Sequence, residues 1–218
     1  MIKQKKHLAI AVAAIGLTVS TVEAVDFTAI ATVENTLAVT SVLPNLDLGT
    51  LFAATNGAAA NNGVGALVIA PDGSVSDPAD SATVKLISLG TPAAAQGSVD
   101  MASNFTLTFP NTSTYLAADF LTGGVDLLAA LAVTTRLQHS SFTGLSLYLT
   151  HFTLGDVSGG TSAEGSTNNG IFTIIKGATD TTYVFNIGAT VTTAPFDTAQ
   201  DTYQPGNYTG TFTVTASY

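Results

Sequence analysis

The sequence predicts an all-β sandwich, and three observations support this prediction. Short apolar stretches alternate with polar residues at a period of two, as expected for strands that bury one face. Clusters of Gly, Asn and Ser separate these stretches, which is typical of antiparallel sheets and not of alternating strands and helices. Hydrophobic residues make up 46% of the chain, so it can bury a core.

The first 24 residues are expected to be a signal peptide. A basic start, an apolar run and a small-residue cleavage site follow one another: Lys3, Lys5 and Lys6; Leu8–Val19; and Val22-Glu23-Ala24. The apolar run is too short to cross a bilayer of about 30 Å as a helix, which disfavours the alternative of a membrane anchor. We therefore expect a secreted mature chain that begins at Val25.

Removal of this segment leaves an acidic chain with few charges. Three basic residues (Lys85, Arg136 and Lys176) remain against fourteen acidic ones, a net charge of −11. Such a balance argues against nucleic acid as a partner. The absence of cysteine excludes disulfides, thiolate metal sites and cysteine nucleophiles.

Directly after the expected cleavage site, the chain has a strand pattern that ends before the main domain. Its apolar face consists of five alternate residues: Val25, Phe27, Ala29, Ala31 and Val33. Asn35 and Thr36 then interrupt the pattern, which resumes at Leu37. We therefore divide the chain into a signal peptide at 1–24, a separate strand at 25–36 and one β-sandwich domain at 37–218. Alternatively, this strand pairs within its own domain.

Further strand patterns are spread along the domain. They cover Leu67–Ala70, Thr83–Leu89, Phe105–Phe109, Leu145–Leu154, Ile171–Ile175 and Tyr183–Val191. The Ala- and Leu-rich stretch Leu116–Val133 could hold one or two helical turns. Gly155–Gly170 is expected to be a flexible polar loop. Pro71-Asp72-Gly73 is expected to be a turn rather than part of a calcium loop.

The last thirteen residues, Gly206–Tyr218, have the clearest strand pattern in the chain. One face contains the large apolar groups, at Tyr208, Gly210, Phe212, Val214, Ala216 and Tyr218. From Thr209 to Ser217, Thr and Ser occupy every position of the other face. We expect one continuous strand that packs its apolar face on the core and exposes its Thr face.

No set of residues in the mature chain suggests catalysis or a cofactor. It has two histidines, His139 and His151, and no Gly-x-Ser-x-Gly, His-Glu-x-x-His or phosphate-binding glycine loop. His151 follows an apolar strand face, so we expect it at a strand end near solvent. The expectation is a non-enzymatic protein with no catalytic residues, no cofactor and no metal site.

The two ends of the mature chain also show a family resemblance. The C-terminal strand reads Gly-x-Tyr-x-Gly-x-aromatic-x-Val-x-x-x-Tyr, and Leu46-Asp47-Leu48-Gly49-Thr50 lies near the mature N-terminus. Both segments resemble those of bacterial pilins assembled by the chaperone–usher route. They are most similar to the cysteine-free pilin-like families, which include spore-coat-U-like proteins.

This resemblance implies both an architecture and a function. The architecture is an immunoglobulin-like β-sandwich that lacks one strand and is completed by a donor strand, Val25–Val33, of the next subunit. The implied function is that of a structural subunit of an extracellular, cell-surface filament, a pilus or fimbria. Its partners would be identical subunits, a periplasmic chaperone and an outer-membrane usher. The alternatives are a monomeric secreted binding module and a biofilm-matrix fibre protein.

Overall fold

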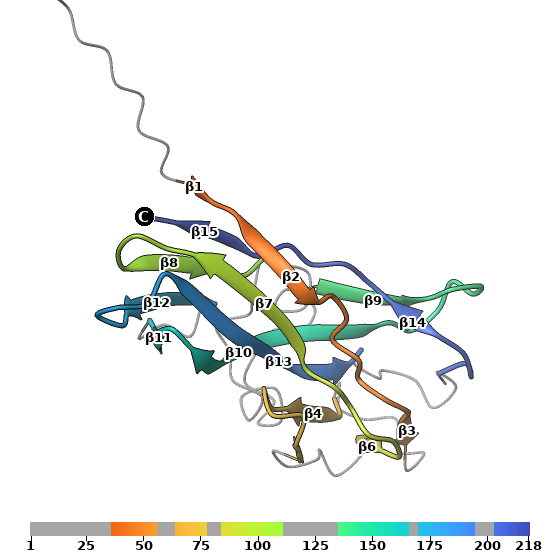
Figure 1. Cartoon of the computed structure of the whole chain (residues 1–218). Coiled ribbons are helices and arrows are strands. Elements are labelled where there is room, and N and C mark those ends of the chain that lie inside the picture. The colour runs from red at the N-terminus through yellow and green to blue at the C-terminus, as the bar shows by residue number, and fades with distance from the viewer. Residues whose placement is uncertain (1–35, 56–63, 78–83, 111–134, 166–169, 195–202) are drawn as a thin grey trace, which may run out of the picture. The chain divides into compact units, whose positions relative to one another are not determined.

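The computed structural model describes residues 36–55, 64–77, 84–110, 135–165, 170–194 and 203–218 (Figure 1). The chain divides into two compact units, residues 1–34 and 35–218, and all described residues belong to the second. The predicted signal peptide and the predicted donor strand therefore lie outside the described residues. The stretch Leu116–Val133, for which helical turns were considered, lies outside them too.

The described residues form strands and no helix, which confirms the predicted all-β class. In chain order the strands are β1 (Thr36–Leu37), β2 (Val39–Leu43), β3 (Leu51–Thr55), β4 (Ala66–Ile69), β5 (Val75–Ser76), β6 (Val84–Ser88), β7 (Ala95–Asp100), β8 (Phe105–Thr108), β9 (Thr135–His139), β10 (Leu147–Ser158), β11 (Gly160–Glu164), β12 (Ile171–Lys176), β13 (Thr182–Thr193), β14 (Tyr208–Thr209) and β15 (Thr215–Ser217). Within this part of the chain, no helix is available that could cross a membrane.

The strands pair antiparallel in two main sheets and a separate ribbon. One sheet has the order β1-β15-β8-β12-β11. In the other, β14, β9, β10 and β13 are neighbours in that order, and β13 then pairs with β7 along one part and with β4 along another. From there, β2 pairs with β7 and β5 with β4. The ribbon consists of β3 and β6 alone.

Aromatic side chains from the two sheets meet in the core. The Phe105 ring on β8 lies 5.9 Å from the Tyr183 ring on β13, edge to face. The Phe109 ring, just after β8, stacks on that of Phe152 on β10 at 5.1 Å. Phe152, Tyr183 and Phe185 are fully buried. The inner faces of the two sheets are therefore packed against each other, and β10 and β13 form the centre of the core.

The predicted strand patterns in the middle of the chain are confirmed. The six expected stretches correspond to β4, β6, β8, β10, β12 and β13. The turn expected at Pro71-Asp72-Gly73 also forms, between β4 and β5. There the Ser74 N–H donates to Asp72 Oδ1 at 2.8 Å, and Gly73 has a positive φ of 81°.

The expectation of a flexible loop over Gly155–Gly170 is wrong for residues 155–164; residues 166–169 lie outside the described residues. β10 continues to Ser158, and β11 begins at Gly160 and joins the other sheet by pairing with β12. Gly159, with a φ of +90°, makes the corner between the sheets. A Cβ at this position would lie 2.0 Å from the carbonyl oxygen of Thr182, so only glycine fits. Ser158, Thr161 and Ser162 are strand residues; the first two are exposed and Ser162 is half-buried.

The expectation that His151 lies at a strand end near solvent is also wrong. His151 is in the middle of β10 and is buried. The register of β10 against β13 shifts between Leu149 and His151, which leaves Thr150 as an extra residue in a β-bulge. Because the bulge reverses the alternation, both Leu149 and Phe152 belong to the core. The sequence pattern gives no sign of this shift.

Candidate binding groove

A groove of about 1120 Å³ opens along one side of the domain. Its first wall is formed by residues from Val39 to Ala53, and its second by the C-terminal residues from Tyr203 to Val214. Buried apolar side chains lie between the walls: Leu86, Ala95, Leu137, Leu147, Leu149 and Ile187. The groove thus exposes apolar surface that belongs to the core of the domain.

The second wall has a strand at each end and an unpaired stretch between them. β14 pairs with β9, at Tyr208–His139 and Thr209–Gln138. β15 pairs with β8 on one side and with β1 on the other. The residues between them, Gly210–Val214, pair with no strand among the described residues. The expected continuous strand over Gly206–Tyr218 is therefore wrong, because a sheet needs a neighbouring strand and Gly210–Val214 has none within the described part of the chain.

The alternation along this wall nevertheless matches the burial of its side chains. Phe212 and Val214 are half-buried and pack on the core, whereas Thr211 and Thr213 are exposed. The Phe212 ring lies 4.8 Å from that of Phe152 in the core. Apolar groups of the wall therefore contribute to the core although its backbone lacks a partner strand.

The first wall is also unpaired on the side of the groove. Among the described strands, β2 pairs only with β7, from Val39–Val99 to Leu43–Gln96. The segment Leu46-Asp47-Leu48-Gly49-Thr50 continues this wall as a tight turn. Asp47 Oδ1 accepts a hydrogen bond from the Gly49 N–H at 2.8 Å, and the backbone of Asp47 exchanges two hydrogen bonds with Ala93. These bonds hold the wall in a fixed position.

One end of the groove is closed by β1 and β15. Thr36 pairs with Ser217 and Leu37 with Ala216, and Ala216 is buried. The Tyr218 hydroxyl accepts a hydrogen bond from the Ala102 N–H at 2.9 Å, which fixes the C-terminal residue. From this end the first wall runs towards β3 (Figure 1) and the second wall towards Tyr203; we call the end lined by Phe52 and Tyr203 the open end of the groove.

Two side chains fix the second wall at the open end. The Tyr203 hydroxyl accepts a hydrogen bond from the Ala194 N–H at 2.7 Å and donates one to the Ser146 carbonyl at 2.8 Å. Burial raises the pKa of Tyr203, so the hydroxyl keeps its proton for this bond. His139 Nδ1 accepts from the N–H groups of Ser141 and Phe142. Its Nε2 therefore bears the proton and donates to the Pro205 carbonyl at 3.1 Å.

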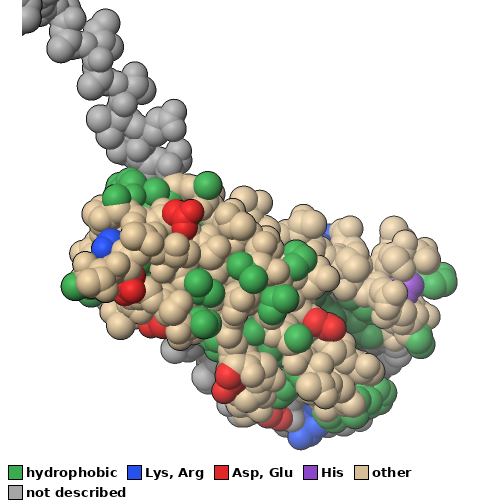
Figure 2. Space-filling model, in the orientation of Figure 1, with side chains coloured by type: hydrophobic (Ala, Val, Ile, Leu, Met, Phe, Trp, Pro, Cys, Tyr) green, Lys and Arg blue, Asp and Glu red, His purple; other side chains and the backbone are tan. Residues whose placement is uncertain are grey.

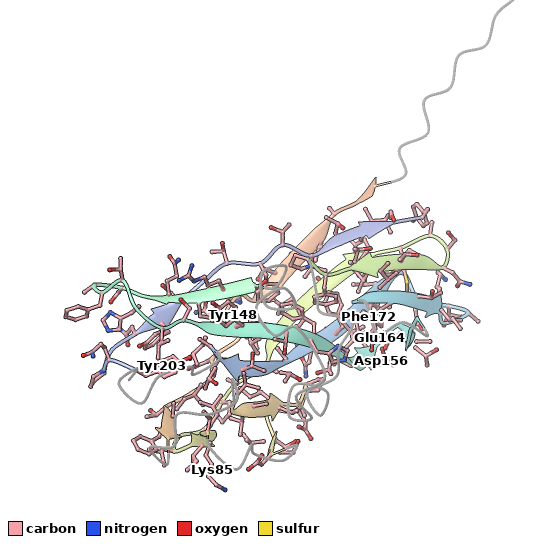
Figure 3. All side chains as sticks on the ribbon, turned by 180° about the vertical axis from the view of Figure 1, so that it is seen from behind. Lys85, Tyr148, Asp156, Glu164, Phe172 and Tyr203 are labelled. Carbon is pink, nitrogen blue, oxygen red and sulfur yellow. The ribbon has the colours of Figure 1, made fainter. Side chains whose placement is uncertain are left out.

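The titratable side chains near β11 lie outside the groove lining. Figure 3 shows Asp156 and Glu164 at the opposite end of the domain from Tyr203. The Tyr183 hydroxyl donates to Asp156, as does the Ser162 N–H at 3.0 Å. Burial alone would raise the pKa of Asp156, but these hydrogen bonds outweigh it and the pKa is lowered. Glu164 Oε2 lies 3.7 Å from Nε2 of His151. These contacts fasten β11 to β10 and β13.

The structure brings together only part of the residues that the sequence indicated. Four of the predicted C-terminal residues line the groove: Tyr208, Gly210, Phe212 and Val214. Ala216 is buried in β15, where it pairs with Leu37 of β1, and Tyr218 follows β15 and is exposed. The five donor-strand residues lie outside the described residues. Sequence patterns missed the groove-lining residues of β9, β7 and the first wall. The Leu-Asp-Leu-Gly-Thr segment was noticed only through its family resemblance.

In the part of the chain that the structure describes, fold and groove together define a class: an all-β protein with an apolar groove between two walls whose facing sides have no partner strand there. Comparison with known proteins adds no name to this class. The chain matches no protein-family model, no curated protein and no solved structure.

Proposed function

We propose that the protein is a structural subunit of an extracellular bacterial filament, polymerised by donor-strand exchange. The observation that supports this most strongly is the groove between β2 and Gly210–Val214. It combines apolar core surface with two walls whose facing sides pair with no strand among the described residues. A peptide that inserts as a strand would cover the apolar surface and pair with both walls at once.

The predicted donor strand suits this groove in pattern and in length. Its nine residues, Val25–Val33, extend over roughly 30 Å as a strand. One face presents Val25, Phe27 and Val33, each of which would contribute about 1.5–3 kcal/mol when fully buried, as an upper estimate. Hydrogen bonds to the walls would add about 0.5–1.5 kcal/mol each.

The free-energy cost of ordering the donor strand requires that the groove of the accepting subunit is already formed. Fixing the donor backbone costs about 1–2 kcal/mol per residue, so little free energy remains for ordering the groove as well. The Asp47 turn and the bonds of Tyr203 and His139 hold the walls in place, which is consistent with a preformed acceptor. Preorganisation of this kind improves affinity without new contacts.

The closed end of the groove supports one direction for the proposed donor. Val33 is the last residue of the proposed donor, and it is followed along the chain by Thr36 and β1 of the donating subunit. The chain of the donating subunit must therefore leave the groove at an end that is not blocked. Since β1 and β15 of the accepting subunit close one end, Val33 belongs at the open end, near Phe52 and Tyr203. The donor would then run antiparallel to Gly210–Val214 and parallel to β2.

The proposal includes the finer architecture and the setting. The body would be an immunoglobulin-like β-sandwich that the donor completes. The signal peptide would direct it out of the cytoplasm, where a periplasmic chaperone would fill the groove until an outer-membrane usher joins the subunits. The mature chain would be found in filaments on the cell surface.

A peptide rescue experiment tests this function. A truncated chain that begins at Asn35 is mixed with a synthetic peptide of residues 25–36, and with the same peptide bearing Phe27→Asp as a control. We expect an unstable truncated chain, which the first peptide stabilises as a soluble monomer, as followed by thermal unfolding and size-exclusion chromatography. The control peptide should bind much more weakly.

Two results would contradict the proposal. Filaments formed by the truncated chain unaided would exclude residues 25–33 as the donor. A full mature chain that stays monomeric, with an unfolding temperature independent of concentration, would instead identify a binding module that completes its own sheet.

A further inference from the structure

An exposed apolar surface lies at the open end of the groove. Phe52 and Ile87 are direct partners across the β3–β6 ribbon and are 52% and 40% exposed. Leu89 follows on the same strand face and is 65% exposed, and Leu43 at the end of β2 is 53% exposed. We call these four residues the docking face. Figure 2 shows hydrophobic side chains gathered over β3 and β6 in this region.

The docking face is not simply the outer edge of the core. The ribbon already turns Val84 and Leu86 inward, where they are buried. The alternate positions of β6, Lys85 and Ile87, point outward, and the exposed Leu89 follows directly after the strand. In the second wall, by contrast, the exposed side chains between Thr209 and Thr213 are all threonines. An exposed cluster of large apolar groups indicates a contact surface.

Chain length identifies what would cover this face. Only Glu34 and Asn35 separate Val33, the last residue of the predicted donor, from Thr36 of β1. Three residue steps span at most about 11 Å, even when fully extended. If Val33 of a donor lies at the open end of the groove, β1 of the donating subunit must therefore lie within this distance of it.

We propose that the docking face binds a second copy of this chain, at the end of its body formed by β1 and β15. This inference rests on the proposed function and extends it, because it assigns a second contact between subunits in addition to the donor strand. The β1–β15 end offers a matching group, Tyr218, which is 46% exposed and held by its bond to Ala102. Aromatic side chains are enriched at such contacts. An apolar contact also suits two subunits that are both strongly acidic, since it brings no like charges together.

The test compares Leu89→Asp with a matched control in the full mature chain. Leu89 is not among the groove-lining residues, so the substitution leaves the donor site intact. Val157→Asp places the same charge at a residue that is 51% exposed, near the end of β10 and outside the groove lining. Increasing amounts of the peptide of residues 25–36 are added, and polymer length is followed by light scattering and negative-stain microscopy. Ile87→Ser serves as a second, milder variant.

We expect the peptide to stop polymerisation of Leu89→Asp at about one tenth of the concentration needed for the wild-type chain. The reason is that the peptide competes only for the groove, whereas a subunit also gains the docking contact. Val157→Asp should behave as the wild type. Peptide-saturated monomers of all variants should unfold at the same temperature, because the substituted side chains are exposed.

Three other outcomes would overturn the inference, and each of them has a different explanation. Equal peptide concentrations for the wild type and Leu89→Asp would exclude the docking contact while leaving donor exchange intact. If Val157→Asp lowered the required peptide concentration as much as Leu89→Asp, the added negative charge would explain the effect and not the position of Leu89. A wild-type chain that forms no filaments at all would remove the proposed function and the docking face together.

Discussion

The strand β13 and the segment Gly210–Val214 both alternate apolar with polar or small residues, yet their surroundings differ. β13 pairs along one side with β10 and along the other with β7 and β4, and its inward side chains are fully buried. Gly210–Val214 has no partner strand among the described residues, and its apolar side chains are half-buried. Alternation therefore specifies which face of a strand packs on the core, but not whether both edges of the strand pair with neighbouring strands.

The largest expected effect comes from the paired region. Phe185→Ala should lower the free energy of unfolding by about 3–5 kcal/mol, because it truncates a fully buried aromatic ring. Phe212→Ala should cost about 1–2 kcal/mol in the chain without a donor, since its ring is only half-buried. Urea unfolding of the truncated chain and of its peptide complex measures both.

The same pair of variants tests whether the two regions really differ in packing. Binding of the donor peptide should enlarge the loss for Phe212→Ala and leave that for Phe185→Ala unchanged, because only the first side chain lines the groove. Equal losses for both variants without peptide would show that the two regions are equally packed.

An effect of similar size is expected in the contact between subunits. Phe27→Ala should weaken this contact by about 3–5 kcal/mol, the usual scale for a buried phenylalanine. The unfolding of the peptide-filled body should not change, because the residue belongs to the donor. Polymer dissociation in denaturant gives the first quantity and thermal unfolding the second. A loss in the body alone would place Phe27 in the core of its own subunit.

A smaller effect is expected at the corner between the sheets. Gly159→Ala should destabilise the fold by about 1–3 kcal/mol, because the residue has a positive φ and its Cβ would meet the Thr182 carbonyl. Gly144→Ala is the matched control, since a Cβ there meets nothing within 4 Å. If both substitutions cost the same by urea unfolding, backbone strain at the corner does not hold β11 in the sheet.

The smallest effect is expected in the dependence of stability on pH in the acid range. The pKa of Asp156 is lowered from 3.8 in the folded chain, so its contribution to stability is present above pH 3.8 and is lost as the pH falls below that value. Asp156→Asn should therefore flatten the decline of unfolding free energy below about pH 4, with a change within about 1 kcal/mol at neutral pH. An unchanged pH profile would show that the hydrogen bonds from Tyr183 and Ser162 do not hold the carboxylate.

The class of the fold and the position of most central strands follow from the sequence pattern alone. A period of two, as in Tyr183–Val191, fixes which side chains face the core, and Pro71-Asp72-Gly73 sets a turn through local backbone preferences. The sequence pattern also indicated which side chains of the C-terminal wall turn inward, because that follows from alternation alone. These features depend only on neighbours in the chain.

The tertiary structure alone decided the features that depend on distant partners. The bulge at Thr150 buries His151, and the corner at Gly159 turns an expected loop into β11, because β13 and β12 supply the pairing. The groove itself arises where the walls at Val39–Ala53 and Tyr203–Val214 approach without pairing. No local pattern encodes such a groove, because it depends on how two segments far apart in the sequence are placed by the rest of the fold.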